Sequence, residues 1–260
     1  MRKVLVVLAT LGVSLGSPAV LPAEAAPALT IKVSTTKVEV GKPVRVSGKA
    51  TNADPGDPVR IQVRKPGTLT WVTVKTVATT ATRTYATRIT LSAAGDNKIR
   101  VKSGKLLSPA LTVTAYTWLR LTRQSFFAAT SGSWLSGTVV LGTTSYPDSI
   151  WSSGAGAWYF NLDRCNRIRY VAGRSDEEAT VQGQFVVSTS TSHEGGGTTN
   201  ASHPVTGNPI SVLDAIPEDD TRLYLSLDDF VDGPVAALGT LEVRCAAASL
   251  PQMHVSDVIS

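Results

Sequence analysis

The chain has 260 residues, and its formal net charge of +5 conceals two oppositely charged parts. Residues 28–116 hold nine Lys and six Arg against four acidic residues, whereas residues 117–260 hold eight Arg, no Lys and fifteen acidic residues. These counts give formal charges of +11 and −7. They argue against a single domain with one kind of surface, and we expect two domains with separate surface tasks.

The first 26 residues have the pattern of a secretory signal peptide. Arg2 and Lys3 precede an apolar run over residues 4–15, which is too short to span a membrane, and Ala23-Glu24-Ala25 offers small residues at cleavage spacing. The competing interpretation of residues 4–15 is a buried core helix. No later apolar stretch reaches about 18 residues, so the sequence predicts a secreted, extracellular protein without membrane insertion.

Residues 27–116 have the alternation of apolar and basic residues that half-buried β-strands require. Val44 and Val46 alternate with Arg45 and Ser47, and from residue 59 to residue 64 Val, Ile and Val alternate with Arg, Gln and Arg. Turn signals at residues 52–58, 65–67 and 95–97 separate such runs. The pattern predicts an antiparallel β-sandwich of about seven short strands with a wet, basic face.

This stretch resembles the immunoglobulin-like spacer domains of bacterial exported proteins. The matching residues are Val40-Gly41-Lys42-Pro43-Val44, Trp71, Tyr85, Ala94-Gly95, and Ile99 with Val101. The basic face of such a domain could attract an anionic cell-wall polymer, or it could only keep a spacer soluble. Nucleic acid is not expected as a partner, because Trp71 and Tyr85 are the only aromatic residues inside this stretch, before Tyr116 at its end, that offer rings for base stacking.

The acidic part contains the two cysteines of the chain, Cys165 and Cys245. An even number of cysteines in an exported chain predicts one disulfide, which closes a loop of about 80 residues. Cys245 is in phase with Leu241 and Val243 on the inward face of a predicted strand. The competing interpretation, a reactive thiol pair, lacks the Cys-x-x-Cys spacing.

Residues 134–246 resemble the NPCBM family of carbohydrate-binding modules, which have a galactose-binding-like jelly roll. The matching segments are Trp158-Tyr159-Phe160-Asn161-Leu162, then Ile168-Arg169-Tyr170-Val171-Ala172-Gly173 followed by Ser175-Asp176, then Val181-Gln182-Gly183-Gln184-Phe185-Val186-Val187. The resemblance implies a jelly-roll module over residues 117–246 that binds carbohydrate. Two departures leave open a conserved fold with an altered sugar site. A polar stretch, Ser188 to Gly207, replaces the family's Asp-Gly-Lys turn, and residues 232–238 lack its His and Trp.

Aromatic residues beside polar loops are the candidates for sugar contact, because pyranose rings stack on flat aromatics while their hydroxyls bond to polar side chains. The candidate ligand-binding residues are Trp134, Tyr146, Asp148, Trp151, Asn161 and Asp176. For Trp134 and Trp151 the alternative is packing at an end of the sandwich. For Asp148, Asn161 and Asp176 the alternative is an ordinary turn or surface position.

Acidic clusters at residues 176–178, 218–220 and 228–232 raise the question of a structural Ca²⁺ site, although no EF-hand spacing occurs. The metal question stays open, and no other cofactor is expected. Residues 247–260 have the composition of a C-terminal tail, for which we expect disorder rather than an added edge strand.

No catalytic motif is present: the chain lacks a Gly-x-Ser-x-Gly elbow, a His-Glu-x-x-His pair and a phosphate loop. We therefore predict a protein that is not an enzyme. The predicted function is recognition of a cell-surface or extracellular glycan through the C-terminal module. The alternative is a structural or adhesion protein that binds another protein and has lost the sugar site. The sequence predicts neither the oligomeric state nor whether the two domains dock.

Overall fold

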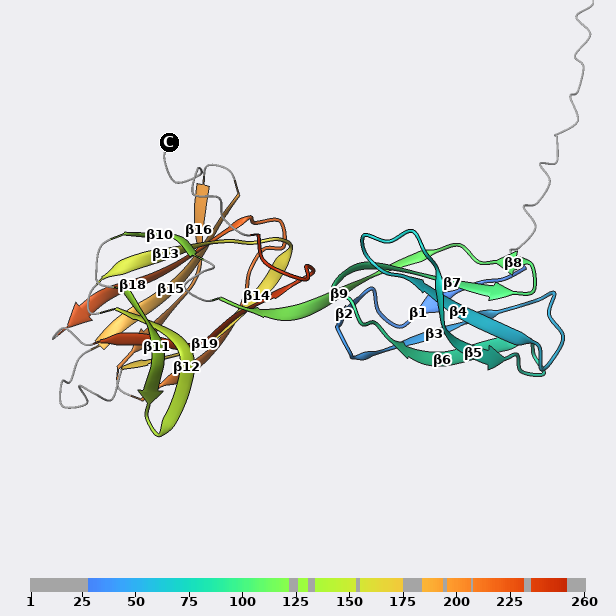
Figure 1. Cartoon of the computed structure of the whole chain (residues 1–260), viewed down its shortest axis with the longest axis horizontal. Coiled ribbons are helices and arrows are strands. Elements are labelled where there is room, and N and C mark those ends of the chain that lie inside the picture. The colour runs from blue at the N-terminus through green and yellow to red at the C-terminus, as the bar shows by residue number, and fades with distance from the viewer. Residues whose placement is uncertain are drawn as a thin grey trace, which may run out of the picture.

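The computed structural model describes residues 28–121, 126–130, 134–152, 155–174, 184–193, 196–206, 208–231 and 235–251. The predicted signal peptide lies outside the described residues. All named elements of the described part are β-strands, so the all-β prediction is confirmed. Within the same part, no helix has the length and hydropathy needed to cross a membrane. Figure 1 shows two lobes that are joined through one long strand, β9.

Two sheets form the N-terminal sandwich. The first has the order β1 (Lys32–Val33), β3 (Pro43–Lys49), β6 (Thr84–Thr90). The second contains β2 (Lys37–Glu39), β9 (Leu111–Arg120), β7 (Gly95–Ser103), β4 (Pro58–Arg64) and β5 (Val72–Ala78), with the short β8 (Leu106–Leu107) paired to β7. β2 runs parallel to β9, and the other pairs are antiparallel. These two sheets form a β-sandwich, and its resemblance to immunoglobulin-like spacer domains stays a prediction.

The core of the N-terminal sandwich follows the predicted alternation. Val44, Val46, Val59 and Ile61 have no exposed surface, whereas the basic residues between them face solvent. Tyr85, which the sequence offered as a stacking residue, is buried instead, and its hydroxyl donates to the Thr30 carbonyl.

Gly48 makes this burial of Tyr85 feasible. A Cβ at position 48 would lie 2.5 Å from Tyr85 Oη and 2.0 Å from the Thr30 carbonyl oxygen. Only glycine leaves room for the ring and the neighbouring strand, so burial of Tyr85 requires glycine at position 48 of β3.

The C-terminal sandwich also has two sheets. The first has the order β10 (Phe126–Thr130), β13 (Gly156–Asn161), β18 (Arg222–Val231), β15 (Gln184–His193), β16 (Gly196–Val205). The second contains β11 (Trp134–Leu141), β12 (Thr144–Ser152), β19 (Ala236–Cys245), β14 (Cys165–Arg174) and β17 (Ile210–Ala215). Two packed sheets of this kind confirm the predicted second β-sandwich of the jelly-roll class.

The core of the C-terminal sandwich lies between its two sheets. Leu223, Leu225 and Leu227 are fully buried, as their alternation along β18 predicts. Cys165 and Cys245 oppose each other on β14 and β19 and form the predicted disulfide. Residues 247–251, which were expected to begin a tail, pack against this core through Ala247 and Leu250, because both side chains cover apolar surface. The rest of the predicted tail lies outside the described residues.

Strand β9 belongs to both sandwiches. Its first residues pair with β2 and β7, and residues 117–120 pair with β19. Val113 and Ala115 lie in the N-terminal core, while Leu119 and Leu121 pack in the C-terminal core. The even-numbered residues 112–120 therefore lie on the face that points away from both cores. The boundary expected at residue 116 falls inside this strand, and one continuous eleven-stranded sheet crosses it.

Candidate functional site

Polar and aromatic side chains gather on the outer face of the sheet formed by β12, β19, β9 and β14. We define the sheet-face site as Trp118, Arg120, Tyr146, Asp148, Arg169 and Glu242. Strand register builds its centre, because Glu242 on β19 lies opposite Arg120 on β9 and opposite Arg169 on β14. Three neighbouring strands thus place an acidic residue between two arginines.

Arg169 is fixed in two ways. Its guanidinium carbon lies 4.1 Å from the centroid of the Trp118 ring, and its Nε donates to Glu242 Oε2 at 2.6 Å. The Glu242 side chain is 19% exposed, whereas that of Arg169 is 43% exposed. A mostly buried carboxylate therefore orients an arginine on an indole ring and leaves part of the guanidinium open to solvent. A charge-assisted hydrogen bond of this kind is among the stronger polar contacts in proteins.

Arg120 connects β9 to the turn at the centre of β12. Its Nη2 donates to the Pro147 carbonyl at 3.0 Å, and its Nη1 lies 3.2 Å from Asp148 Oδ2. Asp148 has a φ of +54°, a left-handed conformation that costs free energy for a non-glycine residue. The Ser149 hydroxyl also donates to the Tyr146 carbonyl within this turn. These bonds hold an exposed carboxylate beside the Arg169–Glu242 pair.

Two aromatic rings lie against glycines on the same face. A Cβ at Gly239 would be 2.6 Å from Tyr146 Cγ, and a Cβ at Gly137 would be 3.1 Å from Trp151 Cη2. Both rings are half-buried and pack against the small cluster of Val139, Leu141 and Ala237. For Trp151 these contacts favour the packing interpretation, while Tyr146 forms the apolar edge of the sheet-face site.

The remaining predicted ligand-binding residues are not gathered at this site. Asn161 is the last residue of β13, which belongs to the other sheet, and it lies opposite Arg222. Trp134 begins β11, but its side chain lies outside the described part, as does the whole of Asp176. Of the six candidates, Tyr146 and Asp148 therefore join the sheet-face site, and Trp151 lies on the same face.

The sequence predictions missed Trp118, Arg120, Arg169 and Glu242. Trp118 and Arg120 do alternate with Thr117 and Leu119, which is the pattern of a strand with one wet face. That signal predicts which side chains face outward. It does not predict which strands lie beside β9, and the site exists only through that pairing.

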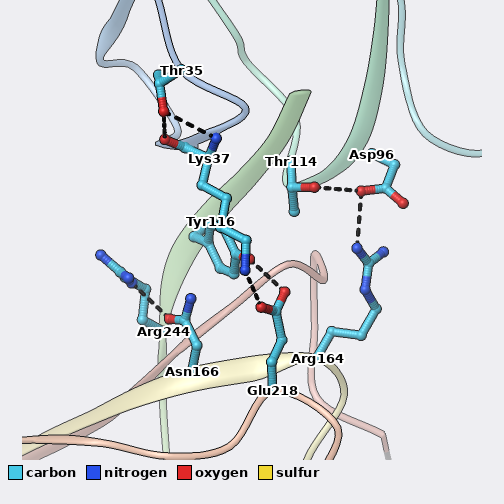
Figure 2. A network of polar contacts seen from close by, with 9 residues as sticks. All are labelled: Thr35, Lys37, Asp96, Thr114, Tyr116, Arg164, Asn166, Glu218 and Arg244. Atoms are coloured by element: carbon cyan, nitrogen blue, oxygen red, sulfur yellow. Dashed lines mark hydrogen bonds and ion pairs between the residues drawn. The ribbon is translucent and has the colours of Figure 1, made fainter. Parts of the chain in front are cut away.

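A polar network joins the two sandwiches, as Figure 2 shows. It adjoins the sheet-face site, because Arg244 on β19 lies opposite Trp118 on β9. Lys37 forms an ion pair with Glu218, and the Tyr116 hydroxyl donates to Glu218 Oε1 at 2.5 Å. Arg164 Nη2 lies 2.9 Å from Asp96 Oδ1, and Arg244 Nη1 lies 3.4 Å from Glu39 Oε1. Each ion pair joins one residue of the N-terminal sandwich to one of the C-terminal sandwich, so the two sandwiches dock through specific contacts.

The network shifts the pKa values of its carboxyl groups. The hydrogen bond from Arg164 is the main cause that lowers the pKa of Asp96. For Glu218, burial acts to raise the pKa, but the hydrogen bonds from Lys37 and Tyr116 outweigh it and the pKa is lowered. Burial, reinforced by Glu218, raises the pKa of Tyr116. Both carboxylates are therefore held in their charged form.

An open hollow of about 860 Å³ lies between the two sandwiches. Residues 92–96 and 246–249 line it together with Asp163 and Arg164. Among the described residues, its lining includes no aromatic ring, so this lining does not offer the stacking surface expected of a sugar site. The sheet-face site fits that chemistry better.

No group of three or more His, Cys, Asp or Glu side chains in the described part could hold a metal ion. Glu218, from one of the acidic clusters, is bonded to Lys37 and Tyr116 instead. His203 lies 2.9 Å from Asp214 and connects the edge strands β16 and β17. Residues 176–178 and Asp232 lie outside the described residues, so the question of a calcium site there stays open.

No protein-family model matches the chain, and no curated protein matches it. Among solved structures, it is similar to the CBM51-2 and INT domains of Clostridium perfringens ZmpB, with 12% identity, a TM-score of 0.43, and coverage of 59% of this chain and 38% of that chain. CBM51-2 of ZmpB in complex with GlcNAc, again with the INT domains, gives 9% identity, a TM-score of 0.44, and coverage of 83% and 48%.

A mutant of CBM29-2, a family 29 carbohydrate-binding module, complexed with cellulohexaose, is also similar, with 8% identity, a TM-score of 0.32, and coverage of 51% of this chain and 94% of that chain. The chain spans less than half the length of the ZmpB structures. These similarities assign no ligand to this chain.

Proposed function

We propose that the protein is secreted and that it recognises carbohydrate without catalysing a reaction, with the sheet-face site as its binding surface. The observation that carries this proposal is the fixed arrangement of Arg169 on Trp118 and Glu242. The resemblance of residues 134–246 to NPCBM modules supports the same class of ligand.

The chemistry of the site suits a neutral or weakly charged sugar. Arg169 and Arg120 supply donors for hydroxyl groups, and the Asp148 side chain, which is 67% exposed, supplies acceptors. Tyr146 supplies an apolar edge for the less polar face of a ring. Because the ion pairs already restrict these side chains, less conformational entropy is lost when a ligand binds.

A glycan array probed with the oxidised protein tests the proposal. We expect selective binding to one glycan class, and we expect Arg169→Gln to weaken it about tenfold, because a lost hydrogen bond from a charged group costs about 1.5 kcal/mol. Asn161→Ala, a change in the other sheet, is the control and should bind like the parent protein. If the folded protein binds no glycan, the proposal is wrong. It is also wrong if Arg169→Gln and Asn161→Ala weaken glycan binding equally.

Binding of another protein is the second candidate function, and β5 favours it. β5 is the edge strand of its sheet, and Val72 and Val74 on it are 52% and 43% exposed, next to Leu69 at 89%. An exposed apolar edge can add a strand from another chain. If the array shows no glycan binding, this function is tested by capturing a protein partner with the parent protein. It would be supported if Val74→Lys abolishes the capture and Asn161→Ala does not.

The proposal also assigns a role to the basic N-terminal sandwich, which is attraction of an anionic cell-wall polymer. Its formal charge of +11 supports long-range attraction. Salt screens such attraction, with a Debye length of about 10 Å at 0.1 M. Retention of the protein on anionic wall material should therefore fall as salt is raised, and salt-independent retention would contradict this role.

A further inference from the structure

Basic residues align in rows across the outer face of β4 and β7. Three pairs of residues lie directly opposite each other, namely Arg60 with Lys102, Gln62 with Arg100, and Arg64 with Lys98. We define the cationic ladder as these five basic residues together with Trp71. The residues between them, such as Ile61 and Ile99, are fully buried, so the ladder side chains point away from the core.

The protein neutralises the charge of the ladder only in small part: Asp96 interacts electrostatically with Lys98, but its hydrogen bonds come from Thr114 and Arg164. Like charges directly opposite each other in an antiparallel pair are destabilising. Within residues 28–116, Glu39 and Asp96 pair with arginines of the other sandwich, and Asp57 accepts a bond from the Asp54 backbone. No ion pair of the described residues includes a ladder cation. An anion from outside the protein would relieve this repulsion.

Trp71 orients two of the three arginines of the ladder, Arg64 and Arg100. Its ring centroid lies 4.1 Å from the Arg100 guanidinium carbon and 5.3 Å from that of Arg64, and Arg100 Nε also donates to Gln62 Oε1 at 2.9 Å. The guanidinium groups therefore occupy the ring on which a base would have to stack, which argues against a nucleic acid as the ligand. Oriented guanidiniums are suited to bidentate contact with carboxylate or phosphate.

We propose that the cationic ladder binds a linear glycan polymer with repeating anionic groups, laid along β4 and β7. Alternate residues of a strand are about 7 Å apart, so the three rows span about 13 Å and match anionic groups repeated at roughly that interval. The inference rests on the proposed attraction of the N-terminal sandwich to anionic wall polymer, and it is independent of the sheet-face site.

A second group of basic residues provides the comparison that the test needs. Arg45, Lys75 and Arg88 surround an open hollow of about 450 Å³ beside β3, β5 and β6. All three side chains are exposed, and no ring contact or ion pair within the described residues orients them. Arg45 lies opposite Arg88, so this group also contains an opposing like-charge pair, but it lacks the Trp71 ring that orients the ladder arginines.

The test measures the affinity of the full chain for polygalacturonate and for polyphosphate over a range of salt concentrations. The ladder variant Arg64→Gln with Lys98→Gln and the control variant Arg45→Gln with Arg88→Gln each remove one pair of opposing positive charges from the same sandwich. We expect the ladder variant to bind about tenfold more weakly at 0.1 M salt, and its slope of log Kd against log salt to fall by about two. The control should change less than about twofold.

Thermal unfolding keeps the result interpretable. The ladder variant should have a nearly unchanged Tm, because removal of a like-charge pair offsets loss of the contact between Arg64 and Trp71. The two polymers distinguish carboxylate from phosphate as the preferred group. Equal weakening in both variants would overturn the ladder while leaving the general attraction intact, and single-stranded DNA bound as tightly as the better polymer would overturn the glycan assignment. If the parent protein binds neither polymer, the proposed attraction fails together with the ladder. An Arg169→Gln variant that loses array binding but retains polymer binding would support two independent surfaces.

Discussion

The two sandwiches share one sheet, yet they arrange charge on its outer face in opposite ways. In the N-terminal part, Arg60 opposes Lys102 and Arg64 opposes Lys98. In the C-terminal part, Glu242 lies between Arg120 and Arg169. A face that balances its own charges can offer fixed donors and acceptors to a neutral ligand, whereas a face that leaves them unbalanced is suited to an external anion. Strand register, rather than net charge, distinguishes these two surfaces.

At the joint between the sandwiches, the placement of individual residues again matters more than net charge. The acidic residues Glu39 and Asp96 come from the basic sandwich, and they pair with arginines of the acidic one. Among the ion pairs of the described residues, only the pair of Lys37 with Glu218 has the polarity of the overall attraction of +11 for −7. Docking depends on a few pairs placed around Tyr116, in the middle of the shared strand.

The largest expected difference between the sandwiches comes from the disulfide, which only the C-terminal one contains. Cys165→Ala with Cys245→Ala should lower the free energy of unfolding of the C-terminal sandwich by about 4 kcal/mol, because the bond closes a loop with a sequence separation of 80 residues. The N-terminal transition should not move. Denaturant titration followed by tryptophan fluorescence measures both, with a Trp71→Phe background removing the single tryptophan of residues 28–116. Equal shifts of both transitions would instead mean that β9 makes the sandwiches unfold as one unit.

Two buried tyrosines, one in each sandwich, should differ by about 1 kcal/mol in what their hydroxyl groups contribute to the free energy of unfolding. The Tyr85 hydroxyl donates to the Thr30 carbonyl, whereas the buried Tyr170 hydroxyl has no hydrogen-bond partner within the described residues. Tyr85→Phe should therefore lower the free energy of unfolding by about 1 kcal/mol, and Tyr170→Phe should leave it unchanged or raise it. Thermal denaturation of the two single variants measures this, each serving as the other's control. A clear loss of stability in Tyr170→Phe would indicate a bound water or another partner for its hydroxyl.

Local patterns predicted much of the fold, because the period of two is a property of short segments. The alternation in β4 and the leucines of β18 followed from it. The Cys165–Cys245 bridge was predicted from the even number of cysteines, and the alternation indicated only that Cys245 faces inward. Tyr146 and Asp148 could also be identified from the sequence, since they lie in a segment with the composition of a turn. The stacking of Arg169 on Trp118 could not, because it depends on which distant strands lie beside β9. For the same reason, basic residues that are scattered along the sequence form rows only once β4 and β7 are paired.

The smallest expected effect concerns the joint, and it depends on pH. The pKa values of Asp96 and Glu218 are lowered in the folded protein. A lowered carboxyl pKa contributes stability above the unfolded value of about 4, and this contribution is lost as pH falls through the folded value. Acidification from pH 6 to pH 3 should therefore weaken the ion pairs with Arg164 and Lys37. Because these groups are partly exposed, the change should alter the angle between the sandwiches more than the stability of either one.

Small-angle X-ray scattering at the two pH values measures that angle through the overall shape of the protein. Asp96→Asn with Glu218→Gln should reproduce the acid form at pH 6 and should abolish the response to pH, while Asp148→Asn, outside the joint, is the matched control. A scattering curve that is identical at both pH values, with both sandwiches folded, would show that pairing of β9 with β7 and β19 fixes the angle by itself. The ion pairs would then select the docked arrangement during folding without being needed to maintain it.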